Sequence, residues 1–140
     1  GFQIASPSLI GIRCVQTAFS MIKEAGIDAI AHKAAVGTQM MIDLYDAWLA
    51  PLGFVLNTSR DPKERGGHIS LVHPDAAQIC VAMREISNVI PDYRTPNSIR
   101  LAISPLPTSF VEVWDGFART RDLVASGQYK TIKEGGSRVT

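Results

Sequence analysis

The chain has 140 residues, enough for one domain that buries roughly two-thirds of its unfolded surface, so folding requires no disulfide framework. Hydrophobic residues make up 46% of the chain and charged residues 19%, which is typical of a globular protein and excludes a disordered one. The net charge of +1, from 14 basic and 13 acidic residues without blocks of either sign, excludes an electrostatic surface for nucleic acid or anionic membrane. No run of about 18 apolar residues and no secretory signal pattern is present, so no membrane partner is predicted.

The first third of the chain predicts two long helices. Ser6 is typical of an N-cap and Pro7 of the first helical position, and apolar residues then recur at helical spacing as far as Gly26. Asp28 is expected to cap a second helix, which continues to Pro51. Because each helix carries an apolar stripe, we expect the two to pack side by side.

The middle of the chain predicts short strands around one helix. A strand at 54–57 is followed by a polar loop, and a second strand at 68–72 alternates apolar and polar residues. Asp75 is expected to begin a helix. Residues 92–97 read as a turn-rich bridge to a last strand at 98–103.

The end of the chain predicts a final helix and a tail. Ser109 and Glu112 form a capping box at the start of this helix, and Gly127 is expected to end it. We therefore divide the chain into a domain, 1–128, and a polar tail, 129–140.

These elements predict an α+β fold. We expect a small, mostly antiparallel sheet of three or four strands, with helices packed on one face and two long helices before it. Because Gly1 opens directly into an apolar segment without an initiator methionine, we expect the chain to be part of something longer.

Arg100 is the main candidate for a functional residue. It lies mid-strand between Ile99 and Leu101, so its side chain points away from the core. Its guanidinium is always charged and offers a planar pair of donors that fits a carboxylate. From position alone, a surface ion pair on a half-exposed strand is the more common explanation.

Other reactive side chains predict no site. His68 and His73 have no third ligand at a recognisable metal spacing, and no serine or cysteine has the partners of a nucleophile. Cys14 and Cys80 fall on apolar helix faces, which predicts buried thiols in a reducing, cytoplasmic compartment.

Three segments resemble the C-terminal small domain of kynureninases, and the resemblance extends over residues 1–128. They read FQIASPS near the start, RGGHISLVH in the middle and PNSIRLAISPLPTSF near the end, and the last is the most specific. The resemblance implies the type I fold of pyridoxal 5'-phosphate (PLP) enzymes and a cytoplasmic homodimer acting in tryptophan catabolism and NAD biosynthesis. The implied reaction is hydrolysis of L-kynurenine, or of 3-hydroxykynurenine, to an anthranilate and L-alanine.

The resemblance also implies roles for individual residues. Arg100 matches the arginine that binds the substrate carboxylate. Ser6 stands where relatives place a residue that contacts the cofactor phosphate or the substrate, with helix capping as the alternative. Ser8, Ile103 and Pro107 depart from the family pattern, which leaves the exact substrate preference open.

The cofactor lysine of the family has no counterpart here. We expect the lysines of the chain to be solvated, and PLP to be bound mainly by a large domain absent from this chain, so that the chain alone is inactive. Two alternatives stay open: a non-catalytic module for oligomerisation or carboxylate binding, and a part of another type I PLP enzyme. The lysines in question are Lys23, Lys33, Lys63, Lys130 and Lys133.

Overall fold

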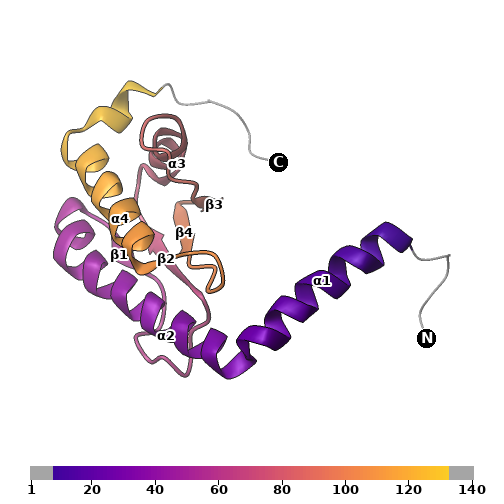
Figure 1. Cartoon of the computed structure of the whole chain (residues 1–140). Helices are drawn as coiled ribbons and strands as arrows, with labels where there is room; N and C mark the ends of the chain where they lie inside the picture. The colour runs from indigo at the N-terminus through magenta and orange to yellow at the C-terminus, as the bar shows by residue number, and fades with distance from the viewer. Residues whose placement is uncertain (1–7, 133–140) are drawn as a thin grey trace.

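The computed structural model describes residues 8–132, and within this range helices and strands form an α+β fold, as predicted (Figure 1). One strand, β3, falls in the segment that we predicted to be a turn-rich bridge, so that prediction was wrong for residues 92–94. The elements are α1 (Leu9–Ala25), α2 (Ile27–Leu44), η1 (Tyr45–Leu49), η2 (Ala50–Leu52), β1 (Val55–Leu56), β2 (His68–Val72), α3 (Ala76–Glu85), β3 (Asp92–Arg94), β4 (Ser98–Ala102), α4 (Phe110–Ala125) and η3 (Gln128–Thr131).

The four strands form one antiparallel sheet in the order β1-β2-β4-β3. Its two faces differ because side chains alternate along each strand. One face carries the buried apolar residues Ile69, Leu71, Ile99 and Leu101, and helices α2, α3 and α4 pack against it. The other face, here called the open face, consists of exposed or half-buried residues: His68, Ser70 and Val72 of β2, Ser98, Arg100 and Ala102 of β4, and Asp92 and Arg94 of β3.

The hydrophobic core lies between the sheet and the three helices. Figure 1 shows α2 and α4 side by side on one side of the sheet. Gly37 lets α2 approach the end of β4, because a Cβ atom there would come within 2.6 Å of the Ile103 Cδ1 atom. The largest fully buried side chains are Ile42, Leu49, Ile69, Leu71, Ile79, Met83 and Ile99.

The predicted capping box of the last helix is confirmed. Ser109 Oγ accepts from the Glu112 backbone N–H at 3.2 Å, and Glu112 Oε2 accepts from the Ser109 backbone N–H at 2.7 Å. The backbone N–H and the hydroxyl of Ser109 both donate to the Glu112 carboxylate, and these two hydrogen bonds lower the pKa of that carboxyl. Gly127 follows the helix with φ of 71°, a left-handed conformation that favours glycine, so the predicted end is also confirmed.

Helix α1 does not pack beside α2, so our expectation of side-by-side packing was wrong. The two helices diverge at Gly26, whose φ of 80° suits glycine, and α1 extends away from the sheet (Figure 1). No residue of α1 is buried. The apolar stripe predicted a helix correctly, but most of this stripe stays exposed in the described part of the chain.

The capping of the first two helices also differs in detail from the prediction. The N-cap of α1 is Ser8, whose hydroxyl accepts from the Gly11 backbone N–H at 3.2 Å. Ser6, which we predicted as the N-cap, lies outside the described residues. Helix α2 begins at Ile27, so Asp28 lies in its first turn and not at its N-cap.

Packing against the core continues past Gln128, where we predicted a polar tail. Tyr129 is only 5% exposed, and its hydroxyl donates to Asp75 Oδ2 at 2.8 Å. A segment beginning with a buried tyrosine is held by the core, so the tail prediction was wrong for residues 129–132. Residues 133–140 lie outside the described range.

The two cysteines have different environments. Cys80 is buried, as predicted, and burial raises the pKa of its thiol to about 12. Cys14 is exposed, so that part of the prediction was wrong, because its apolar helix face has no partner in the described chain.

Among helices within residues 8–132, none combines the length and apolar content that a membrane crossing requires.

Candidate functional site

Arg100 lies at the centre of the open face. It occupies the middle of β4, a strand with neighbours on both sides, and stands opposite Ser70 of β2 and Asp92 of β3. Pairing on both sides fixes the backbone, while the buried neighbours Ile99 and Leu101 fix which face the guanidinium occupies. Its side chain keeps 38% of its surface exposed, enough to meet a ligand or another part of a larger protein.

The guanidinium of Arg100 forms an ion pair with Asp92. The Nη2 atom of Arg100 lies 2.5 Å from Asp92 Oδ2, and Arg94 Nε donates to the same oxygen at 2.9 Å. Desolvation acts to raise the pKa of Asp92, but the hydrogen bond from Arg94 and the charge of Arg100 outweigh it and lower the pKa. The ion pair that we weighed as the alternative explanation for Arg100 is therefore present, and both residues remain partly exposed.

A pair of serines flanks Arg100. Ser70 Oγ and Ser98 Oγ are 2.6 Å apart, so the two hydroxyls share a hydrogen bond across β2 and β4. Thr58 Oγ1 accepts from the Ser70 backbone N–H at 2.8 Å, which ties the loop before β2 to that strand on the side of β1. The open face therefore presents hydroxyls, one carboxylate and two guanidinium groups side by side.

Arg65, at the start of the RGGHISLVH segment, has a structural role. Its Nε donates to Thr38 Oγ1 at 3.1 Å and its Nη2 to Gln39 Oε1 at 2.7 Å, both on α2. Its Nη1 donates to the Arg60 backbone carbonyl at 2.6 Å. Each nitrogen of the guanidinium has a partner, so Arg65 holds the loop before β2 against α2.

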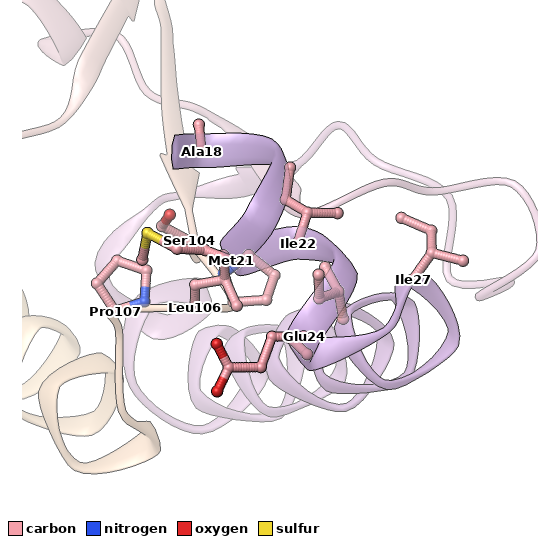
Figure 2. Close-up of a pocket in the computed structure, with 11 residues that line it drawn as sticks. Ala18, Met21, Ile22, Glu24, Ile27, Ser104, Leu106 and Pro107 are labelled. Carbon is pink, nitrogen blue, oxygen red and sulfur yellow. The ribbon is translucent and has the colours of Figure 1, made fainter. Parts of the chain in front are cut away.

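A separate apolar groove lies between the α1–α2 junction and the loop after β4. Its volume is about 890 Å³, and Figure 2 shows Met21 of α1 near Leu106 and Pro107 of the loop. Glu24 is the one ionisable residue in its lining, so the groove suits an apolar group better than a carboxylate. The lining comprises Ala18, Met21, Ile22, Glu24, Ala25, Ile27, Ile30, Ser104, Pro105, Leu106 and Pro107.

The four lysines among residues 8–132 lie at or near the protein surface. Lys23, Lys63 and Lys130 are exposed, and Lys33 is half-buried with its Nζ 6.0 Å from the centre of the Phe110 ring. None of these four lysines is among the residues that line the apolar groove. Metal-ligating side chains, likewise, do not gather in groups of three or more anywhere within residues 8–132.

The structure places the predicted site residues unequally. Arg100 is where the strand pattern predicted it, whereas Ser6 lies outside the described residues, so its proposed contact stays a prediction. Sequence reasoning missed Asp92 and Arg94 as neighbours of Arg100. Three residues show no period of their own, and only the pairing of β3 with β4 brings Asp92 and Arg94, which face the same way on the strand, beside Arg100.

Residues 30–119 match the family described as Kynureninase C-terminal domain. This range includes the whole sheet, with Asp92, Arg94 and Arg100. The chain belongs to this family. A kynureninase of Geobacillus thermodenitrificans (strain NG80-2) is 38% identical over 129 residues, which cover 92% of the chain and 30% of that protein. Kynureninases of Shouchella clausii (strain KSM-K16) and Bacillus thuringiensis subsp. konkukian (strain 97-27) are 36% and 33% identical over 132 residues, which cover 94% of the chain.

The chain spans about 30% of the length of these kynureninases. The family assignment therefore applies to a C-terminal domain derived from an enzyme. The remaining 70% or so of each relative has no counterpart within the matched residues.

Proposed function

We propose that this chain acts as the C-terminal domain of a kynureninase-type, PLP-dependent hydrolase that cleaves L-kynurenine, or 3-hydroxykynurenine, to an anthranilate and L-alanine. The family match and the names of the relatives support the reaction class. The observation that carries the proposal is Arg100 itself, an arginine fixed on an interior strand and directed to the uncovered face of the sheet. In this proposal Arg100 binds the α-carboxylate of the amino-acid substrate.

The chemistry of the guanidinium fits this role. The contact with Asp92 involves Nη2, and the Arg100 side chain keeps 38% of its surface exposed. A carboxylate that meets the exposed part of a guanidinium can accept two parallel charge-assisted hydrogen bonds. Binding of this kind holds the substrate's carboxylate equally in the ground state and the transition state, so the contribution of Arg100 is to substrate affinity.

The cofactor belongs to the proposal only through parts of the protein outside residues 1–140. When bound, PLP supplies electron withdrawal from the α-carbon of an amino acid. No lysine among the described residues is placed to hold it, so we assign no step through the cofactor to this chain. Ser6 remains a proposed contact to the cofactor phosphate or substrate, and a homodimer in the cytoplasm remains the proposed setting.

Exposed apolar residues support the view that this chain works with a larger partner structure. Leu9, Ile10 and Phe19 of α1 are 79%, 80% and 65% exposed. Burial of such side chains is favourable by roughly 1.5–3 kcal/mol each, so a helix that exposes several of them favours a packing partner. The same observation favours a second candidate function, a non-catalytic module for oligomerisation.

One assay separates these two functions. The complete polypeptide that contains residues 1–140 is purified with PLP, and release of the fluorescent anthranilate from L-kynurenine and 3-hydroxykynurenine is followed. We expect the complete polypeptide to release product and residues 1–140 alone to release none. A complete polypeptide that binds PLP yet releases no product from either substrate would favour the module.

A further inference from the structure

The position of Asp92 relative to Arg100 is set by the sheet. The two residues are directly opposite in the antiparallel register of β3 and β4, and both face the open side. Cross-strand neighbours of this kind have Cβ atoms about 4.5–5.5 Å apart. The contact between Arg100 Nη2 and Asp92 Oδ2 is therefore a consequence of the pairing of β3 with β4.

Strand β3 is held by several contacts although it is only three residues long. It pairs with β4, Arg84 Nη2 of α3 donates to the Pro91 carbonyl at 3.0 Å, and the Tyr93 hydroxyl donates to the Pro96 carbonyl at 2.5 Å. Tyr93 also packs against the hydrophobic core on the opposite face. These contacts fix the backbone of Asp92. Its carboxylate is therefore held in a defined position beside Arg100.

Arg94 completes a row of three charges. Its Nε donates to the Asp92 oxygen that also contacts Arg100, so one carboxylate oxygen lies between two guanidinium groups. Two positive charges and one negative charge leave a net charge of +1 on this row. A single substrate carboxylate would neutralise it, whereas a row without Asp92 would carry two unneutralised positive charges that repel each other.

We propose that Asp92 is a positioning residue that orients Arg100 for carboxylate binding, with Arg94 holding Asp92 in turn; this inference rests on the proposed function. Asp92 contacts Nη2 and so restrains the guanidinium on the open face of the sheet. It contacts neither substrate nor cofactor, and it acts only through Arg100. The row would therefore accept ligands with one carboxylate and an adjacent uncharged or cationic group, as in an amino acid.

The test is a double-mutant cycle in the complete polypeptide, with KM and kcat for L-kynurenine measured separately. We expect Asp92→Asn to raise KM about tenfold while kcat changes less than about threefold, because binding geometry is lost and the chemical step is not. In an Arg100→Ala background, Asp92→Asn should change KM less than about twofold, because there is no guanidinium left to orient.

Two further variants guard against a general loss of structure. Asp46→Asn is the matched control, because Asp46 pairs with Arg60 and has the same exposure as Asp92, 45% against 44%, but lies outside the sheet. It should leave KM unchanged. Arg94→Gln keeps the pair between Asp92 and Arg100 and should raise KM by about threefold, since it removes only the outer support of Asp92.

The outcomes separate the two proposals. If Arg100→Ala raises KM and Asp92→Asn does not, the positioning role is overturned and the proposed function stands. An equal effect of Asp92→Asn with and without Arg100 would also overturn it, since Asp92 would then act independently. If Arg100→Ala itself leaves KM unchanged, the proposed carboxylate site fails as well.

Discussion

At the scale of single residues, Arg100 combines a rigid backbone with a partly free side chain. Its strand is paired on both sides, its neighbours in sequence are buried, and its guanidinium meets one carboxylate while 38% of the side chain stays exposed. A surface ion pair of this kind contributes little to stability, typically about 0–1 kcal/mol. The structural cost of losing it is small, so substitutions here report on binding more than on folding.

Replacement of Arg100 by lysine tests the proposed carboxylate contact. A lysine keeps the charge but offers no planar pair of donors. Arg100→Lys should therefore lower kcat/KM roughly 30-fold, which corresponds to a loss of about 2 kcal/mol of transition-state stabilisation. The measurement is the initial rate of anthranilate release by the complete polypeptide. Kinetics equal to those of the parent would remove Arg100 from the mechanism.

Tyr129 gives a second prediction at this scale. Burial raises the pKa of its hydroxyl, and the hydrogen bond to Asp75 raises it further. The folded state therefore holds this proton more tightly than the unfolded state, so its contribution is complete below about pH 10 and is lost as the pH rises through the higher folded pKa. We expect the free energy of unfolding to fall above about pH 10.

The variant Tyr129→Phe isolates this effect. It should lower the free energy of unfolding at pH 7 by about 1 kcal/mol, through loss of one hydrogen bond, and should weaken the decline above about pH 10. Urea unfolding at a series of pH values measures both. A decline as steep in Tyr129→Phe as in the parent would assign it to other groups.

At the scale of elements, most of the local structure was predictable because its signals are local. The strand at 68–72 follows from alternation, and the last helix from its capping box at Ser109. Strand β3 was missed because three residues are too few to show a period, and its turn-forming neighbours dominate the pattern. Pairing with β4, which makes it a strand, joins residues that local patterns do not connect.

The close approach of α2 to the sheet gives a prediction for this scale. Alanine is a better helix former than glycine by about 1 kcal/mol, so Gly116→Ala on α4, where a Cβ meets nothing within 4 Å, should stabilise the protein. Gly37→Ala would place its Cβ 2.6 Å from Ile103 Cδ1 and should be less stable than Gly116→Ala by about 1–2 kcal/mol. Denaturant unfolding of the two variants decides it, and equal gains would show that Ile103 yields freely.

At the scale of the whole molecule, helix α1 was predicted from the sequence but its packing was not. Its apolar spacing predicted a helix, and the helix is present, but the surface that covers such a stripe depends on the rest of a protein. The same holds for the site: alternation placed Arg100 on the open face, whereas its partner Asp92 required the register of two strands. Neither the periodic pattern of the sequence nor the register of the strands identifies the cofactor.

Exposure of α1 makes a prediction for residues 1–140 studied alone. We expect concentration-dependent association in sedimentation experiments, because Leu9, Ile10 and Phe19 expose most of their apolar surface. Serine at Ile10 and Phe19 together should shift the distribution towards monomer. Ile90→Ser is the control, since Ile90 is 87% exposed but lies outside α1, and an equal shift there would argue against α1 as the associating surface.

The hairpin of β3 and β4 has a practical consequence for protein engineering. Residues 92–102 contain the arginine, the carboxylate opposite it and the second arginine beyond, all within eleven consecutive positions. Transplanting this one peptide into the equivalent hairpin of a relative would move Arg100 together with the carboxylate and the arginine beside it. On the proposed function, we expect carboxylate binding to be transferable with this single hairpin.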